Sequence, residues 1–372
     1  MFERRLLKNL DLPLLAATLI LIAYGLAMIY SASFTNRSLT GHDPFYFVKR
    51  QAIFLGIGLA GAAILAYADY QWFARLRRPI YAAMLAGLAA VLVWGNAAGG
   101  AARWISIGAF RLQPSEFAKL ALVISLAAFL AGRVEVVRRP STIGGALLHV
   151  ALPAGLIAFQ PDLGTAMVVV TLWFAMLFLA GARKLHLALI AVGLFGFLAG
   201  AWHLDLLRPY QKARLAVFVD PSIDPLGSGY HIIQSKIAVG SGQILGKGYL
   251  GGTQSQLHFI PAQHTDFIFT VVGEELGFVG AMCLLALYVV LLWRALHVME
   301  RADDPLGMLL AGGVASVFAV QMLVNIGMTI NIMPITGLPL PFFSYGGSSL
   351  VVSMMAVGLV LGIGMRRQRI RF

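Results

Sequence analysis

The chain has 372 residues, of which 59% are hydrophobic and only 12% charged, and its mean hydropathy is +0.82. Soluble domains carry about a quarter charged residues, so this composition excludes an ordinary soluble protein and predicts a polytopic membrane protein. The net charge of +12 would suggest nucleic-acid binding in a soluble chain. In a membrane chain the placement of the charges matters more, and no nucleic acid is expected as a partner. The single cysteine, Cys283, excludes an intrachain disulfide.

Ten apolar segments approach the roughly 20 residues that a bilayer-spanning helix needs. The first follows a basic head, as in a signal peptide, but it is longer than a usual signal core, so a retained helix is predicted. The expected helices are 12–31, 51–68, 79–97, 114–131, 142–159, 162–181, 185–203, 265–293, 306–332 and 346–365. We therefore expect an all-α membrane protein in which 1–372 is a single domain. Its long loop, 204–264, is expected to include a short amphipathic helix at 230–239.

Lys and Arg residues indicate the orientation. With the N-terminus in the cytoplasm, the cytoplasmic segments hold several times more Lys and Arg than the short loops opposite them, as the positive-inside rule requires. Both termini are therefore predicted to be cytoplasmic and the loop 204–264 extracytoplasmic. Ionisable residues at membrane depth are costly and mark function, and here they lie in the outer half: Arg50, Glu116, Lys119, Asp162 and Asp266. The inner halves are apolar, which favours a site open to the outer leaflet.

Asp266 stands where the long loop meets an apolar helix. It belongs to a polar triplet, His264-Thr265-Asp266, that precedes a wall of apolar side chains. A carboxylate at a helix N-terminus can serve as a cap. A carboxylate beside an apolar wall tends to have a raised pKa, which suits a general base. The sequence leaves both roles open.

Five other charged residues have equally plain structural explanations. Glu116 and Lys119 are three residues apart and share a helix face, so they can form a structural ion pair or face a substrate. Asp162 can cap the helix that begins beside it. Glu274 and Glu275 lie two turns beyond Asp266 and are expected to form hydrogen bonds inside the bundle.

A site outside the cytoplasm has no access to ATP, so a synthesis there requires a substrate activated beforehand. Lipid pyrophosphates meet this need, because the pyrophosphate leaves while the lipid tail enters between helices. Such a reaction needs one base and several cations, and the outer side offers Arg50, Arg103, Arg111, Lys119, Lys236 and Lys247. The histidines lack zinc spacing. A carboxylate-bound Mg²⁺, or another divalent cation, would leave no motif and stays open.

The sequence resembles the SEDS family of bacterial cell-wall proteins over almost its whole length. The similarity is carried by RQ at 50–51, RWISIG at 103–108, QPSEFAKLAL at 113–122, QPDLGTA at 160–166, HTDFIFTVVGEELGF at 264–278 and the hairpin GLPLPFFSYGGSS. The segment GYHIIQSKIAVGSGQILGKGYLGGTQSQLHF is similar to the elongation member RodA more than to the division member FtsW. The resemblance implies a peptidoglycan glycosyltransferase of the bacterial cytoplasmic membrane. It also implies lipid II as substrate, undecaprenyl pyrophosphate as leaving group and a class B penicillin-binding protein as transpeptidase partner.

By position, Asp266 matches the family's essential loop carboxylate, which implies a base for the 4-hydroxyl of the acceptor GlcNAc. Glu116 and Lys119 match its paired charges, and Arg50, Arg111 and Asp162 match further polar positions. Lys236, His264 and Thr265 are added as candidate substrate-binding residues. The acidic residue that the family often has near 262–263 is replaced by Ala262-Gln263. Two alternatives remain: a lipid II flippase, which needs a polar path through both leaflets, and a non-catalytic scaffold, which does not need Asp266.

Overall fold

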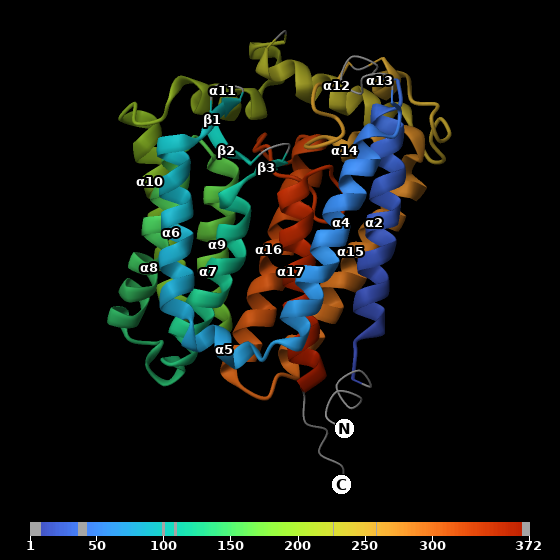
Figure 1. The fold of residues 1–372 in the computed structure, drawn as a ribbon. Helices are drawn as coiled ribbons and strands as arrows, with labels where there is room; N and C mark the ends of the chain where they lie inside the picture. Colours follow the sequence, from blue (N-terminus) through green and yellow to red (C-terminus); the bar gives the residue numbers. More distant parts are fainter. Residues whose placement is uncertain are drawn as a thin grey trace.

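The computed structural model describes residues 9–35, 43–98, 101–107, 110–225, 227–257 and 259–366. Long helices run side by side, and shorter elements cover one end of the bundle (Figure 1). The bundle helices are α2 (Leu12–Ser33), α4 (Tyr46–Tyr67), α6 (Arg77–Trp94), α7 (Pro114–Ala131), α8 (Pro140–Phe159), α9 (Leu163–Leu179), α10 (Lys184–His203), α15 (Gly277–Glu300), α16 (Pro305–Thr329) and α17 (Gly347–Arg366).

Within the described part of the chain, nine of these helices are long and apolar enough to cross a membrane, and α9 is a shorter apolar helix of 17 residues. A helix of that length still lies at the lower end of the range that spans the hydrocarbon core. Each predicted apolar segment therefore corresponds to a helix. The polytopic helical architecture expected from composition is confirmed.

Three helices form the centre of the bundle. Between 72% and 83% of the residues in the apolar stretches of α7, α16 and α17 are buried, whereas only 12% are buried in the apolar stretch of α10. Small residues allow close approach, because a Cβ on Gly358 of α17 would lie 2.2 Å from the carbonyl oxygen of Ala62 on α4. Close backbone contact at small residues is how helices associate where lipid offers no hydrophobic gain. The exposed apolar faces of α6 and α10 are left to contact lipid.

Short elements cover the end of the bundle opposite Asn9 and Arg366, and we call this the loop end (Figure 1). A three-stranded antiparallel sheet pairs Asn96 with Trp104 and Ile105 with Leu112. The loop-end elements are β1 (Asn96–Ala98), β2 (Ala101–Ile107), β3 (Phe110–Leu112), α11 (Pro209–Val219), η2 (Pro221–Ile223), α12 (Ser228–Ser241) and α13 (Thr253–Gln256). Helix α12 confirms the helix expected at 230–239. The sheet and α11 were not predicted.

The other end carries two short elements. Helix α5 (Tyr70–Arg75) joins α4 to α6, and the 3-10 turn η1 (Val134–Val136) joins α7 to α8. The side chain of Asn9 donates a hydrogen bond to the carbonyl oxygen of Met365 at 3.4 Å. The first and last described residues therefore lie together at this end.

The continuous helix predicted at 265–293 is wrong. The chain instead forms α14 (Ile268–Glu275), breaks at Leu276, and resumes as α15. At the break Gly277 has φ +64, and a Cβ there would lie 2.3 Å from the backbone nitrogen of Gly246. The backbone of the long loop occupies the space that a straight helix would fill. Hydropathy does not register this interruption, because the segments before Glu274 and after Gly277 are both apolar and their average masks the two glutamates.

Replacing Gly277 by Ala should lower the apparent melting temperature of the purified protein. A side chain at positive φ costs about 1–2 kcal/mol, and the Cβ would also collide with the loop backbone. Thermal unfolding in detergent measures the effect. Gly155→Ala is the matched control, because nothing lies within 4 Å of a Cβ at that helical position. Equal melting temperatures for the two variants would contradict the steric explanation.

Candidate functional site

Asp266 lies in a turn, 261–267, that leads into α14. The residue at the N-cap of α14 is Phe267, and no side chain caps the helix, so the capping role considered for Asp266 is wrong. Its backbone carbonyl accepts a hydrogen bond from the Asn325 side chain at 2.9 Å, and the same amide group binds the carbonyl of Leu338 at 2.7 Å. Asn325, fully buried in α16, thereby ties the turn to the proline-rich hairpin 334–346.

The hairpin approaches the Asp266 carboxylate directly. Gly337 has φ +72, and a Cβ there would lie 3.4 Å from Oδ2 of Asp266. A glycine at this position allows the backbone to turn tightly with no side chain next to the carboxylate. Asp266 keeps part of its surface accessible, which a group that contacts substrate requires.

Two arginines from distant segments influence the carboxylate electrostatically. Arg103 of β2 donates to the carbonyl oxygens of Gln160, at 3.3 Å, and of Pro161. Arg214 of α11 donates to the carbonyl oxygen of Ile335 at 3.3 Å. Both guanidinium groups interact electrostatically with Asp266. The loop end thus brings a carboxylate and two cations together from three separate segments.

Burial raises the pKa of Asp266 to about 6, and the cations Arg214 and Arg103 and the Thr265 hydroxyl act in the opposite direction. The carboxylate is therefore a stronger base than an ordinary aspartate, yet it is still mainly ionised at neutral pH. A group with these properties can accept a proton from a hydroxyl at physiological pH.

Asp162 caps α9, as the simpler explanation of this residue predicted. Its carboxylate accepts from the backbone nitrogen of Thr165 at 3.2 Å and from its hydroxyl at 2.9 Å. It also accepts from Ser115 at 3.3 Å and from Gln113 at 3.4 Å. The same carboxylate interacts electrostatically with Asp266 and helps to raise its pKa. Asp162 is therefore both a cap and a neighbour of the site.

Glu116 and Lys119 form an ion pair of 2.8 Å inside the bundle, and each residue is 2% exposed. They line a cavity of about 20 Å³ between α7, α16 and α17, together with Gln321. The amide nitrogen of Gln321 is buried and has no hydrogen-bond partner. A cavity of this size holds about one water molecule. In this conformation the pair faces the bundle interior, where a sugar does not fit.

Arg50 and His264 meet in a second cluster around Tyr345 of the hairpin. The Arg50 side chain hydrogen-bonds to the Tyr345 phenol and lies 5.1 Å from the ring centroid of Tyr46. The His264 ring packs against Phe47 at 4.5 Å and against Tyr345 at 5.6 Å between centroids. These contacts bring α4 and the hairpin to the turn that carries Asp266.

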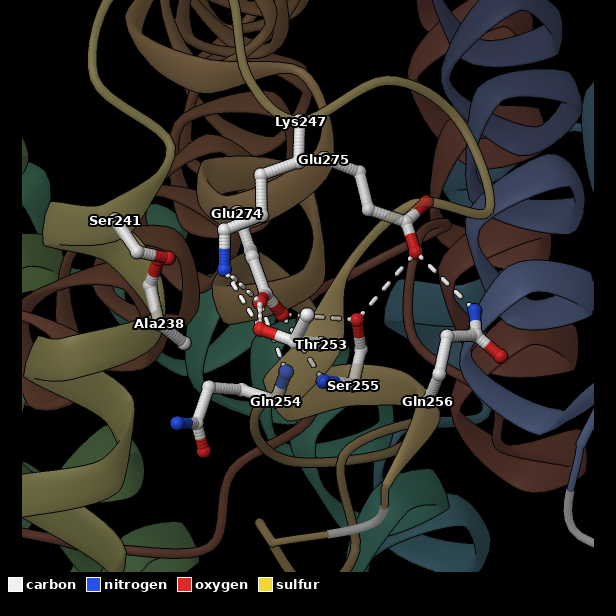
Figure 2. A network of polar contacts seen from close by, with 9 residues as sticks. All are labelled: Ala238, Ser241, Lys247, Thr253, Gln254, Ser255, Gln256, Glu274 and Glu275. Carbon is white, nitrogen blue, oxygen red and sulfur yellow. Dashed lines mark hydrogen bonds and ion pairs between the residues drawn. The ribbon is translucent and has the colours of Figure 1, made fainter.

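The remaining four candidate residues occupy four different environments. Arg111 lies near enough to Tyr345 to lower the pKa of its phenol, against the larger effect of burial. Thr265 donates to the carbonyl of Ala262 at 3.0 Å. Lys236 is exposed on α12. Lys247, considered for the departing pyrophosphate, instead pairs with Glu274 at 2.8 Å (Figure 2).

Arg214, Asn325 and Gly337 were not proposed from the sequence as site residues. Arg214 lies in the long loop, where Lys and Arg carry no topological signal. Asn325 is one of a few polar residues in an apolar helix. Gly337 was noted only as part of the hairpin. The one signal available in the sequence was the Asn325 amide in a membrane helix, because a polar group there must find a hydrogen-bond partner.

A divalent cation fits this site poorly. Asp162 already accepts four hydrogen bonds from its own neighbours, and two arginines stand beside Asp266. Within the described ranges, no group of three or more His, Cys, Asp or Glu side chains is arranged to hold a metal ion. We therefore derive no step through a metal.

The bundle also contains an apolar cavity of about 500 Å³. It runs between α4, α6, α7 and α17, from Phe73 of α5 to Ile105 of β2 and Leu112 of β3. Its lining is almost entirely hydrocarbon, with Leu65 and Met84 among the contributors. The cavity thus reaches the strand that carries Arg103, and its shape suits a long apolar chain.

The fold and the site define a polytopic helical membrane protein with a flanked carboxylate at one end of its bundle. A family model described as Cell cycle protein, for FtsW, RodA and SpoVE, matches residues 12–369. The chain belongs to this family, which is the SEDS family expected from its motifs.

Two curated relatives support this assignment along nearly the whole chain. "Peptidoglycan glycosyltransferase MrdB" of Escherichia coli is 40% identical over 360 residues, which cover 97% of this chain and 95% of the relative. "Stage V sporulation protein E" of Bacillus subtilis is 40% identical over 357 residues, covering 95% and 96%.

Solved structures agree. A chain from a peptidoglycan synthase complex, in which polymerization and crosslinking are coordinated, matches with a TM-score of 0.78 and 36% identity, covering 95% of this chain and 97% of that chain. The rod shape determining protein RodA of Thermus thermophilus matches with a TM-score of 0.71 and 32% identity, covering 97% and 98%. The latter agrees with the expected similarity to RodA.

Proposed function

We propose that this protein is a peptidoglycan glycosyltransferase that polymerises lipid II during cell elongation. The observation that carries the proposal is the partly accessible Asp266 carboxylate, whose pKa is raised to about 6 and which interacts electrostatically with Arg103 and Arg214. Family membership and the names of the relatives support the same activity.

In the proposed reaction, Asp266 accepts the proton of the 4-hydroxyl of the acceptor GlcNAc. That oxygen attacks C1 of the donor sugar, so a glycosidic bond forms while the bond from C1 to the pyrophosphate oxygen breaks. Undecaprenyl pyrophosphate leaves with the bonding electrons. Arg103 and Arg214 lie beside the base, where they can balance the charge that develops on the leaving group.

The apolar cavity offers a place for the polyprenyl chain. It is lined by Ile105, two residues from Arg103 along β2. A lipid tail in the cavity would therefore bring its pyrophosphate toward the arginines. Burial of a long apolar chain supplies binding energy without any specific polar contact.

We further propose that the loop end faces the outside of the bacterial cytoplasmic membrane and that both termini are cytoplasmic. The distribution of Lys and Arg supports this orientation. A class B penicillin-binding protein is the proposed partner, since a related chain is part of a synthase complex that also performs crosslinking. The whole chain 1–372, including the segment 204–264, is proposed to act as one membrane domain.

The test is polymerisation of lipid II by the purified protein with its partner, the transpeptidase of the partner being inactivated. Glycan strands should form with the wild-type protein and disappear with Asp266→Ala, while partner binding is kept. Asp220→Asn, an exposed aspartate of the same end, is the control and should polymerise normally. A scaffold would make no strands in either case. A flippase would instead move labelled lipid II across the bilayer of vesicles. The cavity at Glu116 and Lys119, of about 20 Å³, is too small for a disaccharide to pass.

Replacing Arg214 by Gln should move the acidic limb of the pH–rate profile to higher pH. The Arg214 cation lowers the pKa of Asp266, so its loss raises that pKa above about 6 and leaves more of the base protonated at neutral pH. The profile of kcat/KM for polymerisation measures the shift. Arg208→Gln, an exposed residue at the start of the same helix, is the control. A limb that stays in place, or moves down, would contradict the assignment.

A further inference from the structure

Two consecutive glutamates, Glu274 and Glu275, end α14, and neither has any exposed surface. Buried carboxylates are costly unless charges and hydrogen bonds compensate them. Their position at the C-terminal end of a helix adds an unfavourable interaction with the helix dipole. The reaction proposed above uses neither of them.

The carboxylate of Glu274 accepts five hydrogen bonds from one segment of the long loop, residues 247–255. Its carboxylate is 2.8 Å from the Lys247 ammonium group and 3.2 Å from the Thr253 hydroxyl. It accepts from the backbone nitrogens of Gln254 at 2.8 Å and Ser255 at 3.0 Å, and from the Ser255 hydroxyl at 2.9 Å. Figure 2 shows these donors gathered around one carboxylate. Helix α13 is thereby fixed against α14.

Glu275 points in another direction and joins the same segment to α2. It accepts from the Ser31 hydroxyl at 2.6 Å and from the backbone nitrogen of Leu250 at 3.1 Å. Weaker contacts of 3.4 Å come from Ser255 and Gln256 (Figure 2). The two glutamates thus hold the loop segment 247–256, α14 and α2 together. We call the contacts of Glu274 and Glu275 the glutamate clamp.

The main chain reinforces the glutamate clamp where α14 breaks. The backbone nitrogens of Lys247 and Gly248 donate to the carbonyls of Glu274 and Glu275 at 3.0 and 2.9 Å. Phe278 donates to the carbonyl of Gln243 at 2.8 Å. The loop backbone is therefore hydrogen-bonded to the C-terminal end of α14.

Two routes connect the clamp with Asp266. The first is α14 itself, whose eight residues are all buried and which spans roughly 12 Å from the clamp to the turn 261–267. The second is Ser255, whose carbonyl accepts from the Gln263 side chain at 2.7 Å, while Gln263 also binds the carbonyl of Ala32 at 2.6 Å. Gln263 belongs to the turn that carries Asp266.

We propose that Glu274 and Glu275 are positioning residues that fix the Asp266 carboxylate in the site through α14 and through the Ser255–Gln263 contact. The inference rests on the proposed role of Asp266 as the base. Neither glutamate touches the reacting atoms. A misplacement of about 1 Å at a reacting group can lower a rate about a hundredfold, so the clamp controls kcat rather than substrate binding.

Glu274→Gln keeps the shape of the side chain but removes its charge and places an amide among donors. In the purified complex with its partner, we expect amide hydrogen exchange in 261–267 to become about tenfold faster. We expect kcat for lipid II polymerisation to fall about tenfold to a hundredfold, with KM nearly unchanged. The acidic limb of the pH profile should move to lower pH, because water reaches a loosened Asp266 and its pKa returns toward the ordinary value.

Glu300→Gln is the matched control, because Glu300 is exposed at the far end of α15, and it should leave all three readouts at wild-type values. Ser255→Ala removes hydroxyl bonds to both glutamates with little risk to folding. It should change the readouts in the same direction by severalfold. If Glu274→Gln folds with unchanged exchange and pH profile, the proposal is overturned. Where Glu274→Gln does not fold, wild-type behaviour of Ser255→Ala overturns it instead.

Hydrogen exchange separates this inference from the proposed function. Faster exchange in 261–267, together with normal polymerisation by Asp266→Asn, would show that the clamp holds the turn while Asp266 is not the base. That result would overturn both the proposed role of Asp266 and the proposal that the clamp positions a catalytic group, although the clamp would still hold the turn.

Discussion

Asp266→Asn is expected to lower the rate of lipid II polymerisation about 10²- to 10⁴-fold, the contribution that a positioned general base makes. Asparagine has nearly the same shape as aspartate, and the backbone bond from Asn325 to residue 266 uses the carbonyl, so the turn should keep its place. Loss of rate is then attributable to the loss of the base. Single-turnover polymerisation by the purified complex measures it.

The pH profile provides the internal check for this variant. The wild-type acidic limb should lie near pH 6, because burial raises the pKa of Asp266 to about that value, and activity should rise as pH passes through it. The residual activity of Asp266→Asn should lack this limb. A variant that retains the limb near pH 6 would assign it to another group and would contradict the proposed mechanism.

Breaking the Glu116–Lys119 pair should destabilise the protein strongly. Removal of one partner leaves the other charge buried and uncompensated, which costs about 3–5 kcal/mol. Glu116→Gln and Lys119→Met should therefore each lower the apparent melting temperature markedly. The double variant Glu116→Lys with Lys119→Glu exchanges the two charges and tests the pair further. Recovered stability and activity would indicate a structural bridge, whereas recovered stability alone would indicate contact with substrate.

The chain contains a matched control for this experiment. Lys49 and Asp43 form an ion pair of the same length, 2.8 Å, but with side chains 68% and 39% exposed. Exposed pairs contribute about 0–1 kcal/mol, so Lys49→Met should change the melting temperature little. Similar losses from Lys49→Met and Lys119→Met would show that burial does not decide the effect.

The helices could be predicted from the sequence because a bilayer demands long apolar runs. The turn at Asp162 and the helix at Ser228–Ser241 follow from equally local signals. The break at Gly277 could not, since it is set by loop backbone from more than 25 residues earlier in the sequence approaching the helix. Local patterns contain no such information.

The site itself was predictable only in part. Asp266 was identifiable because a carboxylate at a membrane boundary requires an explanation. Arg214 was not, because its approach to Asp266 depends on how α11 folds back over the hairpin and donates to Ile335. Glu274 and Glu275 were expected to bond within the bundle, and they do, but most of their partners come from the long loop and one, Ser31, from α2. Residues joined across such sequence distances require the tertiary structure.

The complete burial of α14 distinguishes it from the helices at the outside of the bundle. Only 17% of the apolar stretch of α6 and 12% of that of α10 is buried, which leaves their outer faces available to lipid, whereas every residue of α14 is buried in protein. A change in bilayer thickness or lateral pressure therefore acts first on the outer helices. Asp266 is held through α14 and Asn325 of the central α16, which lie behind them. The turn that carries Asp266 is thus anchored to elements that do not themselves form the outer surface of the bundle.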